Sequence, residues 1–388
     1  MMQDPQWLVL FFVAIAIGYW LGRRSRRGRH RNRIENLSRE YMRGLNFLLN
    51  EEPDKAVDIF VGSLDVNANT LDTHLGLARL FRKRGELDRA TRIHSNLLEQ
   101  GDLPDDVREE VELELARDYI SAGLLDRAEL ILQNMIDRGS RSQQAMRYLL
   151  SVFEQEKDWH NALTVGDRLL SSDPAVAPML AHYCCELADR FSGDEQSITR
   201  RMLRRALGYD SNCVRANVML GRLEMHAGQW EDAARVFRRI RRQDPDFFDE
   251  VLDDLERCYT ALGKQESLRR LLAKVSLERP TTAVVLKLAE SLRAEYGEKA
   301  ASLFIADYMK AHPTVRGLNR IIEMNIDQTE GSAREHFGIL QRLTQQLLTE
   351  QAIYQCTNCG FHAHRLHWQC PTCKHWGVLR PHQEQEQR

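Results

Sequence analysis

A period of about 34 residues is the feature that most restricts how this chain can fold. Three stretches align without gaps: RKRGELDRATRIHSNLL, ISAGLLDRAELILQNMI and MHAGQWEDAARVFRRIR. Each contains a glycine followed five residues later by an alanine, as at Gly85 and Ala90. A glycine can end a helix in the left-handed conformation, and a small side chain lets two helices approach closely. The pattern therefore predicts a pair of helices in each repeat, joined by a glycine turn.

The same position recurs along most of the chain. It is occupied by small or apolar residues, with one threonine among them: Ala56, Ala90, Ala128, Ala162, Thr199, Ala233, Leu268 and Ala301. Four prolines fall twelve residues beyond such a position, where a helix must end: Pro174, Pro245, Pro280 and Pro313. A period of this length resembles the tetratricopeptide repeat. Residues 37–348 are therefore predicted to form an all-α superhelix of eight or nine units, whose concave surface binds peptides or partner proteins; a simple spacer is the alternative.

The first residues of the chain have the character of a membrane anchor. Residues 7–21, WLVLFFVAIAIGYWL, carry no charge, and residues 5–22 are near the lower length limit for crossing a bilayer. The aromatic residues expected at the two membrane interfaces are Trp7, Tyr19 and Trp20. A cleaved signal peptide is disfavoured, because the leading MMQDPQ has an acid and no base. Residues 1–22 are predicted to be an uncleaved N-terminal transmembrane helix.

An arginine-rich linker, residues 23–36, sets the predicted topology. Its run RRSRRGRHRNR places seven arginines beside the apolar stretch, and positively charged flanks stay in the cytoplasm. The N-terminus would lie outside, with the bulk of the chain on the cytoplasmic side. The arginines expected to contact anionic phospholipid are Arg23, Arg24, Arg26 and Arg27. Nucleic acid is the weaker alternative ligand for this run.

Four cysteines near the C-terminus have the spacing of a metal site. They form two pairs, Cys356-x-x-Cys359 and Cys370-x-x-Cys373, with ten residues between the pairs. Two such turns facing each other give a tetrahedral site for one zinc or iron ion. In the reducing cytoplasm, metal is expected in place of disulfides. Residues 351–380 are predicted to be a metal-binding module and residues 381–388 a polar tail; whether the metal is zinc or iron stays open.

Other polar and thiol groups are assigned no chemistry of their own. Four histidines, His362, His364, His367 and His375, could compete as ligands, but four thiolates already complete the shell. The scattered cysteines Cys184, Cys185, Cys213 and Cys258 are predicted to be buried in the core. The basic patches at residues 200–205 and 235–242 are interpreted as solvated surface, with an acidic partner or lipid as the alternative. No catalytic motif is present, so an enzyme is not expected, and a redox protein or a nucleic-acid binder is a minor alternative.

Two resemblances add to these predictions. The cysteine turns resemble the rubredoxin metal site, with Lys374 where a glycine is usual. The anchor running into GYWLGRRS, the stretch LSREYMRGLNFLLNEEPDKAVDIF and the tail CTNCGF…HWQCPTC together resemble the lipopolysaccharide assembly protein B family of gram-negative bacteria. This second resemblance covers the whole chain.

The resemblance to that family implies a function in detail. It implies a non-enzymatic adaptor at the bacterial inner membrane, with the N-terminus in the periplasm. The adaptor would restrain lipopolysaccharide synthesis by promoting degradation of the lipid A committed-step deacetylase by the membrane protease FtsH. It would also contact an inner-membrane protein that senses lipopolysaccharide, and could form a homodimer. The four cysteines of the tail would be the metal ligands, with the module packed against the repeats. A general scaffold for envelope assembly is the alternative.

Overall fold

The computed structural model describes most of the repeat region and the cysteine-rich tail. The described residues are 42–47, 49–50, 52–62, 71–99, 103–139, 141–191, 196–326, 329–350 and 352–381. The predicted anchor with Trp7, Tyr19 and Trp20, the arginine-rich linker, and the polar tail beyond Pro381 lie outside these residues. Within the described part of the chain, no helix is both long enough and apolar enough to cross a membrane.

The chain divides into two compact units, with the boundary between Asp158 and Trp159. The helices described in the first unit are α2 (Pro53–Gly62), α3 (Leu71–Lys83), α4 (Leu87–Glu99), α5 (Asp105–Ser121), α6 (Leu125–Asp137) and α7 (Ser142–Glu156). Residues 42–47 are also helical. Within this unit each helix from α3 onward packs against the next, as the predicted repeat requires.

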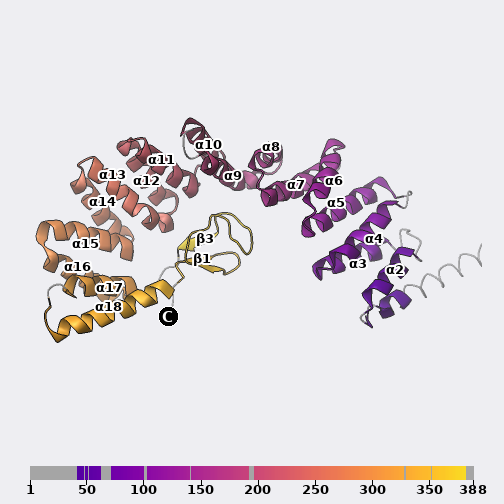
Figure 1. Ribbon diagram of the computed structural model, residues 1–388. Coiled ribbons are helices and arrows are strands. Elements are labelled where there is room, and N and C mark those ends of the chain that lie inside the picture. Colours follow the sequence, from indigo (N-terminus) through magenta and orange to yellow (C-terminus); the bar gives the residue numbers. More distant parts are fainter. Residues whose placement is uncertain are drawn as a thin grey trace, which may run out of the picture. The chain divides into compact units, whose positions relative to one another are not determined.

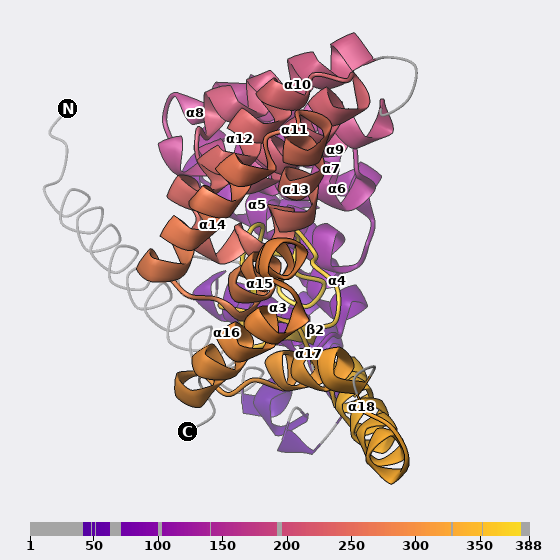
Figure 2. The same cartoon turned by 90° about the vertical axis from the view of Figure 1, so that its left-hand side faces the viewer.

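The second unit contains more of the described helices than the first. They are α8 (Trp159–Leu170), α9 (Ala177–Arg190), α10 (Gln196–Tyr209), α11 (Val214–His226), α12 (Trp230–Gln243), α13 (Leu252–Ala261), α14 (Gln265–Glu278), α15 (Thr282–Tyr296), α16 (Glu298–Ala311), α17 (Val315–Ile326) and α18 (Ser332–Glu350). Short 3-10 turns lie at η1 (Pro174–Val176), η2 (Pro245–Phe247) and η3 (Asp249–Val251). Consecutive helices pack in pairs, and Figure 2 shows α17 and α18 side by side at one end of this unit.

The repeat pattern of the sequence is confirmed in the helix turns. Gly85, between α3 and α4, has φ of 79°, and Gly228, between α11 and α12, has φ of 71°. The N–H of Gly85 donates to the carbonyl of Arg82 at 3.0 Å, so the left-handed residue closes the helix end. Proline at 174 and 245 begins a 3-10 turn after the preceding helix has ended.

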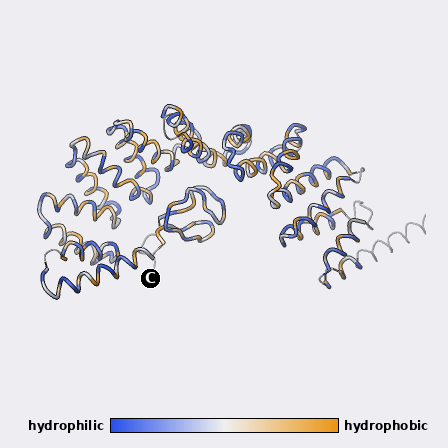
Figure 3. Tube along the Cα trace, viewed as in Figure 1, coloured by the Kyte–Doolittle hydropathy of each residue, from blue (hydrophilic) through white to orange (hydrophobic). Residues whose placement is uncertain are grey.

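The recurring small positions are all buried. Each of the eight is at most 8% exposed: Ala56, Ala90, Ala128, Ala162, Thr199, Ala233, Leu268 and Ala301. Figure 3 shows apolar residues recurring between polar ones along each helix. In the second unit, Ala233 and Leu268 join a core that runs from α11 to α15 and includes Phe237, Leu255 and Val284. The helical repeat predicted from the spacing is therefore present.

The contact between α11 and α12 gives a test of this close packing. A Cβ added at Gly221 would lie 2.4 Å from Cε1 of Phe237, a ring that is fully buried. We expect Gly221→Ala to lower the free energy of unfolding of the second unit by about 1–3 kcal/mol, because the ring cannot move aside without disturbing the core. Denaturant unfolding would measure the change. As control, Gly208→Ala in α10 meets nothing within 4 Å and should leave stability unchanged or slightly raised.

Candidate metal centre

Three short strands frame the cysteine-rich tail. They are β1 (Tyr354–Cys356), β2 (His362–Ala363) and β3 (Leu379–Pro381), in the order β2-β1-β3, and both pairings are antiparallel. The central strand buries Tyr354 and Cys356 and leaves Gln355 between them half-buried. An isolated bridge pairs Gln369 with Trp376 around the second cysteine pair. The tail therefore consists of two strand-and-turn halves, as the sequence indicates.

The first turn carries Cys356 and Cys359. The N–H of Cys356 donates to the carbonyl of Phe361 at 2.8 Å, and the N–H of Gly360 donates back to the carbonyl of Cys356 at 3.0 Å. Gly360 has φ of 75°, the left-handed region that glycine enters without strain. The backbone N–H of Cys359 also points at the sulfur of Cys356, at 3.5 Å. These bonds hold the first pair of sulfurs on one face of the turn.

The second turn repeats the same backbone pattern. The N–H of Cys370 donates to the carbonyl of His375 at 2.9 Å, and the N–H of Lys374 donates to the carbonyl of Cys370 at 2.9 Å. Lys374 takes the left-handed conformation, with φ of 60°, at the position that Gly360 holds in the first turn. A lysine at the usual glycine position thus preserves the turn, at a conformational cost.

That cost can be measured by substitution. We expect Lys374→Gly to stabilise the metal-loaded module by about 1 kcal/mol, because a left-handed backbone is unfavourable for any residue with a Cβ. Thermal unfolding or resistance to a chelator would report it. As control, Thr372→Gly lies in the same turn without a positive φ and should lower stability through backbone entropy. A loss of stability in Lys374→Gly would contradict this account of the turn.

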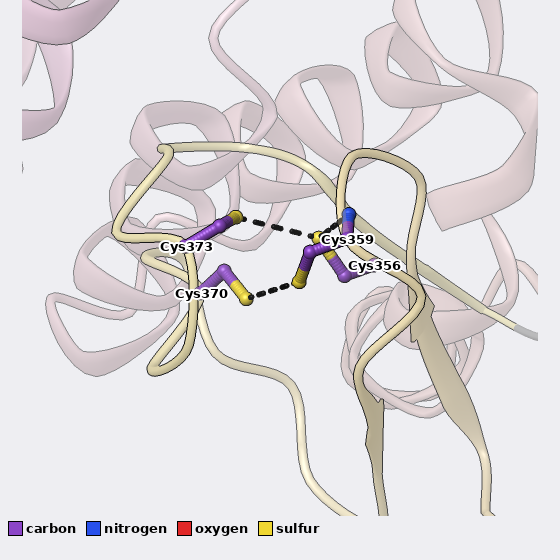
Figure 4. A group of neighbouring side chains, drawn as sticks. All are labelled: Cys356, Cys359, Cys370 and Cys373. Carbon is purple, nitrogen blue, oxygen red and sulfur yellow. Dashed lines mark hydrogen bonds between the residues drawn. The ribbon is translucent and has the colours of Figure 1, made fainter. Parts of the chain in front are cut away.

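The four predicted ligand atoms come together between the two turns. The Sγ atoms of Cys356, Cys359, Cys370 and Cys373 all lie within 4.8 Å of one another. Across the turns, Cys356 Sγ is 3.7 Å from Cys373 Sγ, and Cys359 Sγ is 3.7 Å from Cys370 Sγ (Figure 4). A tetrahedral ion with metal–sulfur bonds of about 2.3 Å places its sulfurs about 3.8 Å apart. The geometry therefore fits one tetrahedrally bound ion.

Hydrogen bonds give the four thiols different pKa values, so some lose their proton at lower pH than others. The side chain of Asn358 and the backbone N–H of His375 lower the pKa of Cys373 to about 5 by stabilising its thiolate. For Cys359, the N–H of Phe361 favours the thiolate, but desolvation and hydrogen bonds with the other cysteines outweigh it and raise the pKa to about 12. Four adjacent thiolates need a cation to neutralise them. A bound zinc or iron ion would supply that charge, and a site closed by four protein ligands stabilises the fold and leaves no position for substrate.

The module docks on the repeats of the second unit through Trp376. Its ring stacks on the ring of His182, with centroids 5.1 Å apart and an interplanar angle of 22°. The rings of Tyr183 and Trp159 each meet Trp376 edge-on at 6.0 Å. Burial and the positive charge of Arg215 lower the pKa of His182 to about 3, so the imidazole is neutral in this stack. These aromatic residues belong to no motif of the sequence that predicts their contact.

A second set of contacts fixes the other edge of the module. Trp368 stacks on Phe247 of η2, with centroids 5.6 Å apart. The guanidinium of Arg380 lies over the same phenylalanine ring, 5.2 Å from its centroid, and pairs with Asp244. The hydroxyl of Tyr354 donates to Glu250 at 2.6 Å. Figure 1 shows β1 and β3 on the inner side of the curve formed by the helices of this unit.

Comparison with known proteins agrees with both parts of this architecture. A family model described as the rubredoxin metal binding domain matches residues 354–381, and two tetratricopeptide repeat models match residues 113–177 and 199–255. Lipopolysaccharide assembly protein B of Escherichia coli (strain K12) is 34% identical over 377 residues, covering 96% of this chain and 97% of that protein. The chain belongs to the lipopolysaccharide assembly protein B family.

A further relative and a solved structure extend the comparison. Lipopolysaccharide assembly protein B of Haemophilus influenzae (strain Rd) is 31% identical over 392 residues, covering 97% of this chain and 98% of that protein. A solved tetratricopeptide repeat protein from Parabacteroides merdae is 15% identical, with a TM-score of 0.35, and covers 72% of this chain and 100% of that chain.

The structure also places the scattered cysteines and the histidines of the tail. The scattered cysteines Cys184, Cys185, Cys213 and Cys258 are all buried, as predicted. Within the described residues, the group that could hold a metal contains no histidine. His375 contacts the site indirectly, with Nδ1 2.9 Å from the carbonyl oxygen of Cys373.

Three arginines of the two basic patches pair with acids of other helices. In residues 200–205, Arg200 pairs with Glu224 at 2.8 Å. In residues 235–242, Arg241 pairs with Glu278 at 2.6 Å. These pairs stabilise contacts between helices and take part of the charge of each patch away from a polyanion.

Proposed function

We propose that this protein is a non-enzymatic adaptor that regulates lipopolysaccharide synthesis at the bacterial inner membrane. It presents the lipid A committed-step deacetylase to the membrane protease FtsH for degradation. The observation that carries the proposal is the relationship to lipopolysaccharide assembly protein B along 96% of the chain. That relationship includes both the repeats and the metal module, so it extends to the whole architecture and not to one common motif.

The structure supports an adaptor on chemical grounds. Tetratricopeptide repeats supply surfaces for polypeptides and no catalytic group of their own. The four thiols form a closed set, and a tetrathiolate site of this kind stabilises structure. The module contacts α9 through Trp376, and Asp244 and η2 through Arg380, so the metal supports the shape of a repeat surface.

The predicted anchor completes the proposal. Residues 1–22 would hold the protein in the inner membrane with its N-terminus in the periplasm, and Arg23, Arg24, Arg26 and Arg27 would contact anionic phospholipid. An adaptor fixed beside a membrane protease raises the effective concentration of its client there, so modest contacts suffice. An inner-membrane protein that senses lipopolysaccharide, and a second copy of the chain, are further proposed partners.

Crosslinking in membranes followed by detergent purification and mass spectrometry tests the proposal. We expect the full-length protein to recover the protease and the deacetylase. A variant with serine at Cys356, Cys359, Cys370 and Cys373 should recover less of both, whereas Cys258→Ala, which changes a cysteine outside the module, should behave as wild type. Recovery of nucleic acid or unrelated envelope proteins, with neither the protease nor the deacetylase, would contradict the adaptor function.

A further inference from the structure

A small apolar pocket lies on the second unit where the basic helix α12 ends. It has a volume of about 240 Å³, and its apolar lining comes from Pro245, Phe248, Val275 and Val284. Phe248, Val275 and Val284 are at most 5% exposed, so they belong to the rigid core. This volume is below the roughly 300–1,000 Å³ of sites for whole small molecules. The pocket therefore fits one short aliphatic group.

Five charged side chains line the pocket, and four of them have an ion-pair or hydrogen-bond partner. Arg241 binds Glu278 at 2.6 Å, and Arg279 pairs with Asp246. The Asp249 carboxylate accepts a hydrogen bond from the hydroxyl of Thr281 at 2.9 Å. The fifth is Arg242.

Arg242 lines the same pocket, is exposed, and makes no ion pair or side-chain hydrogen bond within the described part of the chain. An exposed guanidinium beside an apolar pocket can bind a carboxylate with two parallel hydrogen bonds. The required ligand therefore combines one negative charge with one adjacent aliphatic group. A pair between Arg242 and a ligand carboxylate would also give the basic patch at residues 235–242 a role besides the contacts between repeats.

We propose that this pocket binds the C-terminal residue of a partner polypeptide. An aliphatic side chain, such as that of leucine or valine, enters the pocket, and the terminal carboxylate pairs with Arg242. A C-terminal residue carries both groups on one Cα atom, which matches a pocket that has an arginine at its rim. Capture of a terminal carboxylate is an established mode of peptide recognition. Naming a polypeptide as the ligand rests on the proposed adaptor function.

Peptide binding to the metal-loaded full-length protein tests the inference. The probe is fluorescein-labelled Gly-Ser-Gly-Ala-Leu with a free carboxylate, measured by fluorescence anisotropy against the same peptide with an amidated C-terminus. We expect the free acid to bind about 10- to 100-fold more tightly, because a charged hydrogen bond is lost on amidation. Arg242→Gln should abolish this difference. Arg239→Gln, an exposed arginine of α12 that does not line the pocket, should retain it.

A second variant tests the pocket itself. Val275→Met extends a side chain into the cavity and should weaken binding of the free acid at least tenfold, with thermal unfolding as the check that the fold is intact. Equal binding of acid and amide, or no binding of either at millimolar concentration, would overturn the inference. If isovalerate bound as tightly as the free-acid peptide, the pocket would be a site for small anions, and the proposal of a polypeptide ligand would be wrong. These results do not depend on FtsH, so the crosslinking experiment decides the proposed function separately.

Discussion

Removing the metal, or replacing Cys370 by serine, is expected to unfold the C-terminal module and release it from the repeats. The buried side chains of the module are few: Tyr354, Cys356, Ala363, Cys370 and Leu379. Two of these five are cysteines of the predicted metal site, and a core of this size cannot stabilise about thirty residues without a metal or disulfide. Metal binding to a thiolate site of this class supplies an apparent free energy of about 10–16 kcal/mol. Loss of the ion therefore removes more free energy than the remaining contacts of the module supply, and the module is expected to unfold.

Tryptophan fluorescence and limited proteolysis would report this unfolding. Trp368 and Trp376 pack against Phe247 and His182, so release should move their emission to longer wavelength and open residues 352–381 to cleavage. Cys258→Ala, a buried cysteine of α13 outside the module, should keep both readouts at their wild-type values. A protein shown by metal analysis to be metal-free, yet still protected from protease across the module, would contradict the expected result.

The repeat and the metal ligands could be predicted from sequence because both depend on local spacing. Gly85 and Ala90 determine a turn and a close helix contact within one repeat, and neighbouring repeats supply the rest of the packing. A two-residue gap between cysteines likewise fixes a turn before any distant contact forms. Both features can therefore be predicted without knowing which distant residues come into contact in the folded protein.

The docking of the module was not predictable in this way. Trp376 and His182 are separated by nearly two hundred residues, and no periodicity links them. Trp368 and Trp376 flank the second cysteine pair, so they could be noticed as apolar side chains on a module with almost no core. Their partners in η2 and α9 could be found only once the repeats were folded.

A buried charge network in the first unit was also missed. Asp118 of α5 is fully buried; its Oδ1 accepts from Arg82 at 2.8 Å, and its Oδ2 lies 2.5 Å from Nδ1 of His94. Arg82 also donates to Glu114 at 2.5 Å. Charged residues on repeat helices are normally assigned to the solvent side. Here the network joins α3, α4 and α5, so its members are separated in sequence by up to a full repeat.

The hydrogen bonds and charges of this network shift the pKa of Glu114. Burial alone would raise the pKa of Glu114, but the hydrogen bond from Arg82 and the charges of Arg82, Arg117 and Arg79 outweigh it and lower the pKa. A carboxylate with a lowered pKa in the folded state contributes stability above its ordinary pKa, and this contribution is lost as the pH falls through the folded value. Network variants should therefore be compared at neutral pH, where Glu114 is ionised.

Asp118→Ala is expected to lower the free energy of unfolding of the first unit by about 3–5 kcal/mol at neutral pH. The substitution removes the acceptor that a largely buried guanidinium and a fully buried imidazole share, and leaves Glu114 as the only acidic partner of Arg82 among the described residues. Breaking a buried ion pair by removing one partner is strongly destabilising. Denaturant unfolding would measure the change. Glu110→Ala is the matched control, because Glu110 also pairs with an arginine of α3 but both side chains are more than a third exposed. It should cost at most about 1 kcal/mol. If the two substitutions had equal effects, the network would be an ordinary surface ion pair and would not hold the three helices in register.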